Sequence, residues 1–357
     1  MSETYNRVYF VTGGGTGGHI FPALSIANAV KAKCPEAEIL FVGAIGKMEM
    51  ERVPAAGYPI KGLPVAGLKR SLALSNLALP FKVIRSVRMA GKIIREFKPD
   101  VVVGVGGYAS APLLWSASRM GVPTLIQEQN SYAGVTNKIL SKRAKMICVA
   151  YDGMERFFPK EKIKLTGNPV RKNLLEMRAN RKEAMKAMNL DDNRKCVLIV
   201  GGSLGARSIN EGIIANIEKI RANKDIQFIW QTGKLYFEEM KKRADELGKP
   251  KNLTITDFVS NMGNALGAAD LVVSRAGAGS ISEFALLGKA VILVPSPNVS
   301  EDHQTKNAMA LVDKDAAIYV ADANVKEELI DKAVETVNDG MKIALLEANI
   351  VKMGKPN

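Results

Sequence analysis

Cysteine is scarce in this sequence. Its three cysteines, Cys34, Cys148 and Cys196, are scattered and form no Cys-x-x-Cys pair. This spacing argues against a disulfide framework and a structural zinc site, and it is typical of a reducing compartment. Acidic residues offer no metal site either, because Asp313-Lys314-Asp315 lies between a predicted helix and a predicted strand and is interpreted as a turn. We therefore expect no metal ion and no other cofactor.

Long apolar runs are also absent. No run reaches the roughly 18–20 apolar residues that a membrane-spanning helix needs, and the polar residues 1–6 do not resemble a secretion signal. Aromatic residues make up 6% of the chain, and histidine occurs twice, at His19 and His303. The scarcity of aromatic side chains in the basic part of the chain, and the lack of a recognition motif, argue against nucleic-acid binding.

Positive charge, in contrast, is in excess. The 357 residues have a formal net charge of +14. Residues 1–170 hold 23 basic and 11 acidic residues, a net +12, whereas residues 171–357 hold 27 and 25, a net +2. A basic half is typical of contact with an anionic membrane surface, a polyanionic substrate or nucleic acid, and solubility alone would also explain it.

The predicted elements alternate between strand and helix along the whole chain. The strands are rich in Val and Ile without period-two alternation, which predicts parallel sheets covered by helices on both faces. The length predicts two domains, and a boundary near residues 167–170 divides them into 1–168 and 169–357. The predicted strands are 8–11, 39–42, 101–105, 124–127, 146–149 and 164–166, then 197–200, 227–231, 254–256, 271–273, 291–294 and 317–320.

Glycine-rich corners follow strands at residues 12–18, 104–112, 201–207 and 274–283. A strand, a glycine loop and a helix in this order direct backbone N–H groups and the positive end of the helix dipole at one point, which favours an anion. The first corner matches Gly-x-Gly-x-x-Gly and leads into a helix predicted from about Ile20. However, the strand after it ends without the carboxylate that an NAD ribose needs, and no Gly-Lys-Ser/Thr follows any loop. NAD and P-loop nucleotides are therefore disfavoured.

Ligands of open α/β sheets lie beyond the carboxyl ends of the strands, so two such halves predict one cleft with a ligand on each side. His19, at a helix N-terminus, would be neutral and able to accept a proton near pH 7. Glu283, expected in the first turn of its helix, would either cap that helix or bind ribose hydroxyls. Arg171 would neutralise a diphosphate or be a plain surface residue, and the polar groups of 302–307 would meet sugar hydroxyls or solvent.

The stretch 69–98 combines leucines with positive charge, having eight Lys or Arg residues against one acid, Glu96. Residues 83–97 are expected to form a core helix with a solvated basic face. The part around Pro80 is more apolar than a loop needs, and an apolar patch ringed by positive charge suits an anionic bilayer. The expected patch includes Leu72, Leu77, Phe81, Lys82 and Arg85.

Seven motifs in register resemble the MurG family of GT-B glycosyltransferases, over nearly the whole chain. The resemblance implies two Rossmann-like, doubly wound parallel-sheet domains facing a central cleft. It also implies inverting, metal-independent transfer of N-acetylglucosamine from UDP-GlcNAc to the 4-hydroxyl of the MurNAc of lipid I, giving lipid II in peptidoglycan synthesis. The motifs are Gly-Gly-Thr-Gly-Gly-His-Ile-Phe-Pro-Ala (14–23), Gly-Val-Gly-Gly-Tyr-Ala-Ser-Ala-Pro (104–112), Gln-Glu-Gln-Asn (127–130), Gly-Asn-Pro-Val-Arg (167–171), Gly-Gly-Ser-Leu-Gly-Ala-Arg (201–207), the 274–283 corner and Asp-His-Gln-Thr-Lys-Asn-Ala (302–308).

The resemblance also implies roles for individual residues. The N-terminal domain would bind the acceptor and face the membrane, and the C-terminal domain would bind UDP-GlcNAc. His19 is the candidate base, with Tyr108 and Glu128 as alternatives. The family's membrane patch falls on 69–85 and adds Trp115. The implied UDP-GlcNAc-binding residues are Thr16, Gly17, Gly18, Asn130, Arg171, Ser203, Val259, Ala278, Gly279, Ser280, Ile281, Glu283 and Gln304, of which the glycines and Thr16 would alternatively cradle the lipid diphosphate.

A peripheral location at the cytoplasmic face of the plasma membrane follows from the same resemblance. Two other functions stay open: a UDP-sugar epimerase or hydrolase on the same scaffold, and a non-enzymatic protein that binds nucleotide sugars or organises a membrane. Family members usually close with a helix that crosses back to the N-terminal domain, and the loop-like end at 353–357 predicts no such helix here.

Overall fold

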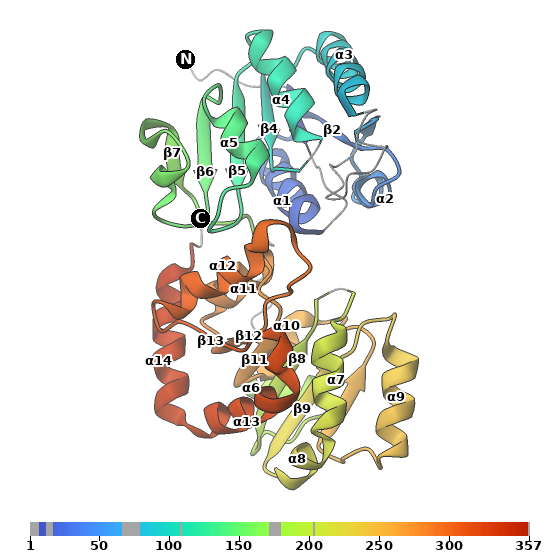
Figure 1. The fold of residues 1–357 in the computed structure, drawn as a ribbon, viewed down its shortest axis with the longest axis vertical. Helices are drawn as coiled ribbons and strands as arrows, with labels where there is room; N and C mark the ends of the chain where they lie inside the picture. The colour runs from blue at the N-terminus through green and yellow to red at the C-terminus, as the bar shows by residue number, and fades with distance from the viewer. Residues whose placement is uncertain are drawn as a thin grey trace. The chain divides into compact units, whose positions relative to one another are not determined.

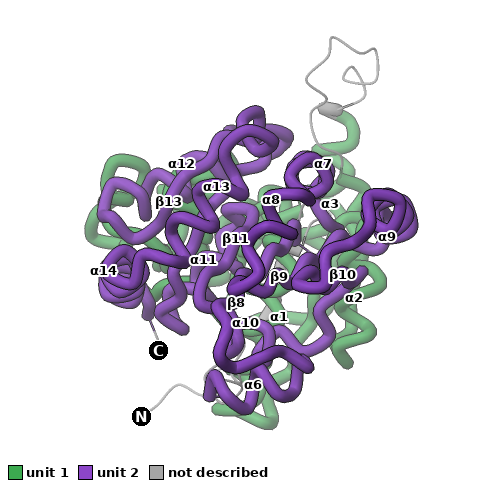
Figure 2. The backbone as a smooth tube through the Cα atoms, turned by 90° about the horizontal axis from the view of Figure 1, so that it is seen from below, with its two compact units in different colours: residues 1–170, 357 green, residues 171–356 purple. Residues whose placement is uncertain are grey.

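The computed structural model of the protein describes residues 7–11, 17–65, 79–107, 109–170, 180–202 and 204–355. The chain divides into two compact units, residues 1–170 with residue 357 and residues 171–356 (Figure 2). Each unit contains one sheet of parallel strands with helices against it (Figure 1). The predicted fold class, two α/β units with parallel sheets, is confirmed.

The sheet of the first unit has the order β3-β2-β1-β4-β5-β6-β7. Its strands are β1 (Arg7–Val11), β2 (Glu38–Ala44), β3 (Ile60–Leu63), β4 (Val101–Gly104), β5 (Thr124–Glu128), β6 (Met146–Val149) and β7 (Ile163–Leu165). Its helices are α1 (Gly17–Lys33), α2 (Glu49–Ala55), α3 (Leu79–Phe97), α4 (Ser110–Arg119) and α5 (Val135–Ser141), with 3-10 turns η2 (Met154–Arg156) and η3 (Lys160–Lys162).

Strand β2 shows why the strands lack alternation. Ile39 and Phe41 pack in a cluster with residues of α1 and α2, whereas Leu40 and Val42 pack in a second cluster with residues of α3 and α4. All four side chains are at most 7% exposed. A strand that is buried on both faces needs an apolar residue at every position, which is the pattern that predicted a parallel sheet.

The edge strand β3 was not among the predicted strands. It pairs with β2 from Phe41↔Ile60 to Ala44↔Leu63. Its four residues, Ile-Lys-Gly-Leu, include a lysine and a glycine and are mostly not buried. Edge strands are often short and polar, so no apolar run marks them in a sequence.

The sheet of the second unit has the order β10-β9-β8-β11-β12-β13. Its strands are β8 (Lys195–Val200), β9 (Ile226–Gln231), β10 (Leu253–Thr256), β11 (Leu271–Ser274), β12 (Val291–Leu293) and β13 (Ile318–Tyr319). Its helices are α6 (Arg181–Ala187), α7 (Arg207–Ala215), α8 (Ile217–Ala222), α9 (Phe237–Glu246), α10 (Met262–Ala268), α11 (Ala278–Leu287), α12 (His303–Val312), α13 (Val325–Asn338) and α14 (Gly340–Ile350), with 3-10 turns η4 (Ser300–Asp302), η5 (Asp322–Asn324) and η6 (Val351–Met353).

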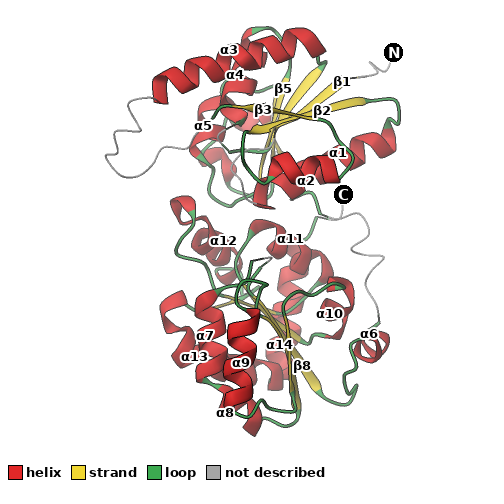
Figure 3. Ribbon diagram, turned by 90° about the vertical axis from the view of Figure 1, so that its right-hand side faces the viewer, coloured by secondary structure: helices red, strands yellow, loops and turns green. Residues whose placement is uncertain are grey.

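Helices α7, α9 and α13 cover one face of this sheet, and α10 and α11 lie on the other (Figure 3). The core of the first face includes Trp230 on β9, which is fully buried. Its indole N–H donates to Oδ1 of Asn210 on α7 at 2.9 Å. The hydrogen bond satisfies the one polar atom of this large side chain, which burial would otherwise leave unpaired.

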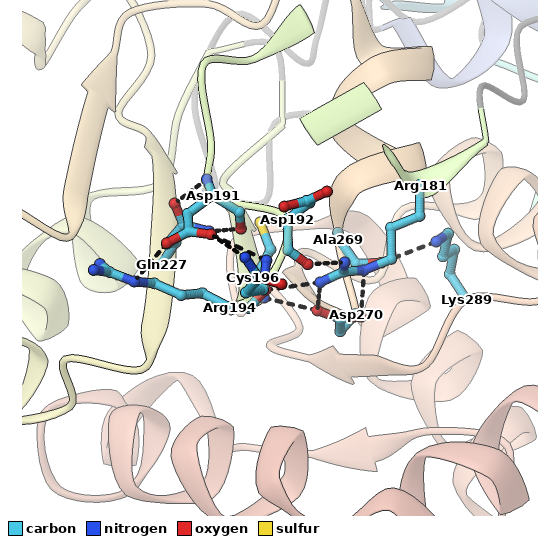
Figure 4. Close-up of polar contacts among 10 residues, drawn as sticks. Arg181, Asp191, Asp192, Arg194, Cys196, Gln227, Ala269, Asp270 and Lys289 are labelled. Carbon is cyan, nitrogen blue, oxygen red and sulfur yellow. Dashed lines mark hydrogen bonds and ion pairs between the residues drawn. The ribbon is translucent and has the colours of Figure 1, made fainter. Parts of the chain in front are cut away.

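Arg181 ties helix α6 to the amino ends of strands β8 and β11 (Figure 4). Its guanidinium donates to both carboxylate oxygens of Asp270 at 3.0 Å, and to the carbonyls of Asp192 and Arg194. The hydrogen bonds that Arg181 donates to the Asp270 carboxylate raise the pKa of Arg181. Asp270 also accepts from the amide of Cys196, whose thiol pKa burial raises to about 12. Cys196 therefore stays a protonated, inert thiol within a structural network.

Candidate functional site

The topology brings two glycine corners of the first unit together. Strand β1 lies between β2 and β4, so the helix after β1 and the loop after β4 begin at the same edge, where the strand order reverses. Helix α1 begins at Gly17 rather than near Ile20, which places His19 in its first turn. Gly18 is exposed and His19 is half-buried. Two predicted site residues of these corners, Thr16 and Tyr108, lie outside the described residues.

His19 packs against the loop that follows β4. A Cβ added to Gly106 would lie 3.1 Å from Nε2 and 3.2 Å from Cδ2 of His19. Gly106 also has a φ of +95°, a conformation that residues with a Cβ rarely adopt. Position 106 therefore requires glycine for two reasons: the positive φ of the turn, and the space that the imidazole of His19 occupies.

Glu128, at the end of β5, organises the loop that follows it. Its carboxylate is 2% exposed. Oε1 accepts from the backbone N–H of Asn130 at 3.1 Å and from its side-chain amide at 3.3 Å. Oε2 accepts from the N–H of Gly134 at 3.0 Å and from Nδ2 of Asn137 at 2.8 Å. Both oxygens are thus occupied by donors from the loop and from the first turn of α5.

Asn137 was not singled out in the sequence, although it belongs to this cluster. It is 2% exposed, on a short helix whose other buried residues are Leu140 and Ser141. A buried asparagine side chain needs specific hydrogen-bond partners. No local pattern marked this residue, and the partner Glu128 could be identified only from the fold.

The side-chain amides of Gln127, Gln129 and Asn168 form a second buried network of hydrogen bonds. It links the end of β5 to the loop after β4 and to residue 168. Nε2 of Gln129 donates to the carbonyl of Val105 at 2.8 Å, and it also contacts Gln127. Nε2 of Gln127 donates to Oδ1 of Asn168 at 3.0 Å, and Nδ2 of Asn168 donates to the carbonyl of Gln129 at 3.0 Å. The Gln-Glu-Gln motif therefore holds the loop after β4 and residue 168 in place.

In the second unit, the corner after β11 ends in a helix N-terminus. The N-cap of α11 is Gly277, and the first intrahelical hydrogen bond runs from Ile281 N–H to its carbonyl. Gly279 is exposed and Ser280 is half-buried in the turn before that bond, at the positive end of the helix dipole. This arrangement is suited to a phosphate.

Glu283 does not lie in the first turn of α11, so the prediction that it could cap this helix is wrong. The helix begins at Ala278, and its first turn contains no acidic residue. Glu283 is in the second turn and half-buried. Its role as a ligand of ribose hydroxyls remains a prediction.

The side chain of Arg275, within this corner, is bound to other groups of the protein. Its guanidinium pairs with Asp322, and it donates to Oγ of Ser208 at 2.8 Å and to the carbonyls of Val294 and Pro295. Its side chain is 14% exposed. Arg275 therefore ties the loops after β11 and β12 to the start of α7, and it is poorly placed to bind a phosphate.

Helix α12 contributes to the same edge of the sheet. Oε1 of Gln304 accepts from the N–H of Ser296 at 2.9 Å, which holds the loop after β12. Nδ2 of Asn307 lies 3.4 Å from the carbonyl of Ala276 in the corner after β11. His303 Nε2 lies 3.6 Å from a carboxylate oxygen of Glu301. The polar residues of 302–307 are thus structured around the corner rather than forming a solvated loop.

The remaining predicted donor residues lie on neighbouring loops or cannot be placed. Val259 follows β10, with its side chain 5% exposed. Gln231 links this loop to the corner after β8, because its Nε2 donates to the carbonyls of Asp257 and Gly202. Arg171 and Ser203 lie outside the described residues, so their roles stay predictions.

Helix α3 exposes apolar side chains at its start. Phe81 is 76% exposed, and Val83 and Ile84 are 51% and 50% exposed. Lys82 and Arg85 are exposed beside them. The apolar surface therefore extends into the part of the helix that was predicted to be solvated and basic.

Trp115 lies on the helix that packs against α3. Its side chain is 37% exposed, with the guanidinium of Arg119 5.0 Å from its ring centroid. Ser116 next to it donates to the carbonyl of Val87 at 3.3 Å, which joins α4 to α3. The predicted patch residues Leu72 and Leu77 lie outside the described part of the chain. Among the described helices, none is long and apolar enough to cross a membrane.

Comparison with known proteins supplies the family. The glycosyltransferase family 28 N-terminal domain matches residues 9–149, and the glycosyltransferase family 28 C-terminal domain matches residues 196–351. A Phocaeicola vulgatus protein named UDP-N-acetylglucosamine–N-acetylmuramyl-(pentapeptide) pyrophosphoryl-undecaprenol N-acetylglucosamine transferase is 62% identical over 348 residues. That match covers 98% of this chain and 92% of the relative.

Solved structures agree with this match. MurG from Acinetobacter baumannii superposes with a TM-score of 0.76 at 29% identity, covering 98% of this chain and 94% of the other. UDP-GlcNAc 2-epimerase from Neisseria meningitidis bound to UDP-GlcNAc has a TM-score of 0.67 at 14% identity, with 98% and 96% covered, and so shares only the fold. The fold is GT-B, and the chain belongs to glycosyltransferase family 28.

Proposed function

We propose that the protein transfers N-acetylglucosamine from UDP-GlcNAc to the 4-hydroxyl of the MurNAc of lipid I, giving lipid II. The observation that carries this proposal is the 62% identity, along 98% of the chain, to a transferase whose name states this donor and acceptor. The reaction serves peptidoglycan synthesis. It inverts the sugar carbon, because the acceptor oxygen attacks from the side opposite to the departing UDP.

The second unit binds UDP-GlcNAc in this proposal. The start of α11 binds the diphosphate through Ala278, Gly279, Ser280 and Ile281. Glu283 binds the ribose hydroxyls. Ser203 and Arg171 contact the diphosphate region, the backbone of Val259 contacts the uracil, and Gln304 contacts the sugar. The guanidinium of Arg275 already binds Asp322, Ser208 and a backbone carbonyl, so it is not available to a ligand. This supports Arg171 as the cation that binds the diphosphate.

The first unit binds lipid I in this proposal. Thr16, Gly17 and Gly18 hold the lipid diphosphate or meet the donor sugar, and Asn130 reaches the sugars. His19 removes the proton of the 4-hydroxyl as that oxygen attacks. A helix dipole and an arginine stabilise the departing UDP, so the proposed transfer needs no metal ion. The domain roles thus follow the predicted division into 1–168 and 169–357.

Transfer of radiolabelled N-acetylglucosamine from the UDP sugar to a lipid I analogue tests the function. We expect lipid II to form at the same rate with and without EDTA. If no label reaches lipid I, the transferase assignment fails. Conversion of UDP-GlcNAc without an acceptor would instead support the epimerase or hydrolase alternative. Loss of transfer in EDTA would contradict the metal-free mechanism.

We expect Gly106→Ala to lower kcat about tenfold to a hundredfold, because a displacement of a catalytic group by about 1 Å can cost a hundredfold. The added Cβ would lie 3.1 Å from His19 Nε2. Gly121→Ala is the matched control, since Gly121 has a φ of +79° but nothing within 4 Å of its Cβ position. Steady-state kinetics of both variants should show the loss of kcat only at position 106. Similar kcat values would mean that the Gly106 contact does not position His19.

The membrane location is part of the same proposal. The protein acts as a peripheral enzyme at the cytoplasmic face of the plasma membrane, where its lipid acceptor lies. Support comes from exposed apolar side chains interleaved with positive charge at the start of α3, next to the helix that carries Trp115. Phe81 inserts among acyl chains, and Lys82 and Arg85 attract anionic headgroups.

We expect Phe81→Ser combined with Lys82→Glu to lower binding to phosphatidylglycerol-containing vesicles about tenfold or more, because each basic residue near such a surface contributes about 1 kcal/mol. Met341→Ser with Lys342→Glu is the matched control, since it changes an exposed apolar residue and its exposed basic neighbour on α14. Vesicle co-sedimentation measures both variants. Equal losses of binding would place the membrane surface elsewhere.

A further inference from the structure

Asn137 contains a buried acceptor atom that no described residue uses. Its Oδ1 accepts no hydrogen bond within the described chain, although the atom is inaccessible to solvent. Buried polar atoms in native proteins are nearly always paired, so an unpaired one calls for an explanation. Asn137 itself is 2% exposed, and solvent cannot supply the missing donor.

The orientation of the Asn137 amide is determined by its neighbour. Nδ2 lies 2.8 Å from Oε2 of Glu128. A carboxylate oxygen that takes part in a hydrogen bond with an amide meets the N–H₂ group, so the amide cannot be turned around without losing this bond. Glu128 is itself held by Asn130 and Gly134. The carboxylate therefore fixes both the position of Asn137 and the direction of its oxygen.

Asn137 and His19 meet at Gly106. A Cβ placed on Gly106 would lie 3.1 Å from Nε2 of His19 and 3.7 Å from Nδ2 of Asn137. The imidazole edge and the amide therefore converge on the same small space, although they belong to helices α1 and α5. When His19 takes up a proton, its ring carries two N–H donors. The unused oxygen of Asn137 is an acceptor in the same neighbourhood.

We propose that Glu128 and Asn137 are positioning residues for His19: Glu128 holds the amide of Asn137, and Asn137 holds the imidazole edge beside Gly106. This inference deepens the proposed function, because it rests on His19 as the base. It also assigns Glu128 a role other than proton acceptor. A proton added to either of its oxygens would face N–H groups that already donate to that oxygen.

Because the chain has only two histidines, nuclear magnetic resonance of the protein with ¹⁵N-labelled histidine can test the contact directly. The signals of His303 are assigned with a His303→Gln variant. We expect Asn137→Ser and Glu128→Gln to shift the imidazole ¹⁵N signals of His19, which report its tautomer, and to leave those of His303 in place. Asn216→Ser is the matched control, because Asn216 is a buried asparagine in the second unit whose Nδ2 donates to two carbonyls. It should leave His19 unchanged.

Kinetics supply the second measurement. Loss of one buried hydrogen bond should lower kcat about tenfold in Asn137→Ser and in Glu128→Gln, with KM for UDP-GlcNAc unchanged. In a His19→Ala background, Asn137→Ser should have no further effect, because it acts through the imidazole.

Unchanged His19 signals in both variants, or effects that multiply in the His19→Ala background, would overturn the proposal. Shifted His303 signals would reveal a general disturbance of the fold in that variant, and the variant whose His303 signals stay in place then decides. If His19→Ala keeps full kcat, the base assignment fails. The resonance experiment still reports separately whether Asn137 holds the ring.

Discussion

His19→Ala should lower kcat for transfer to lipid I by about 10²–10⁴-fold, the contribution that a positioned general base makes in enzymes. The acceptor 4-hydroxyl is a weak nucleophile until a base removes its proton. His19 lies in the first turn of α1, half-buried against Gly106, at the switch point of the first sheet. No other histidine belongs to this unit, since His303 lies in the second.

The affinity for UDP separates this effect from general damage. Because UDP is assigned to the second unit, its dissociation constant should be the same for His19→Ala and the unchanged protein, as measured by titration calorimetry. His19→Gln keeps a polar side chain of similar reach but cannot take up a proton, so it should be as impaired as the alanine variant. A kcat within a few-fold of the original would move the role of base to the alternative candidate Tyr108.

Gly205→Ala should destabilise the second unit by about 4 kcal/mol or more, a loss that few single substitutions cause. Its Cβ would lie 2.0 Å from the carbonyl oxygen of Thr232 and 3.0 Å from the Cα of Gly233. Backbone atoms cannot rotate away as side-chain ends do. Gly205 also has a φ of +79°. The loops after β8 and β9 can therefore approach each other only because Gly205 and Gly233 lack side chains.

Gly202→Ala in the same loop is the matched control. Gly202 has a φ of +87° but no atom within 4 Å of its Cβ position. Alanine there should lower the free energy of unfolding only by the cost of the left-handed backbone conformation, roughly 1–2 kcal/mol. Urea unfolding of both variants can be followed by the fluorescence of Trp230, the tryptophan of this unit, in a Trp115→Phe background. Equal destabilisation by the two substitutions would show that the close approach of the loops is not what requires glycine at 205.

Much of the fold could be predicted because its strands are buried on both faces. Continuous apolar runs such as 39–42 and 197–200 mark such strands without any knowledge of their partners. The glycine corners were equally visible, since turns between a strand and a helix near a ligand need residues without a Cβ. The edge strand β3 was missed because an exposed edge places no such demand on its residues.

The site was only partly predictable. The motifs predicted His19, Glu128 and the start of α11 as site residues, and each lies at the end of a strand or at the start of a helix, which the local sequence indicates. The first-turn position of Glu283 was predicted wrongly, since helix starts depend on backbone geometry that a glycine-rich sequence leaves open. The roles of Asn137 and Arg275 depend on partners 9 and 47 residues away along the chain. No local pattern reveals such partners.

The sequence by itself determined the alternation of strands and helices, the parallel sheets, the corners where anions can bind and the family. These features depend on neighbouring residues, whose spacing along the chain decides what is buried. The tertiary structure alone decided that the imidazole of His19 packs against Gly106. It also decided that both carboxylate oxygens of Glu128 accept hydrogen bonds from the loop and from Asn137, and that the guanidinium of Arg275 binds other groups of the protein. These contacts join segments that are distant in sequence, and the order of the strands in the sheets brings them together.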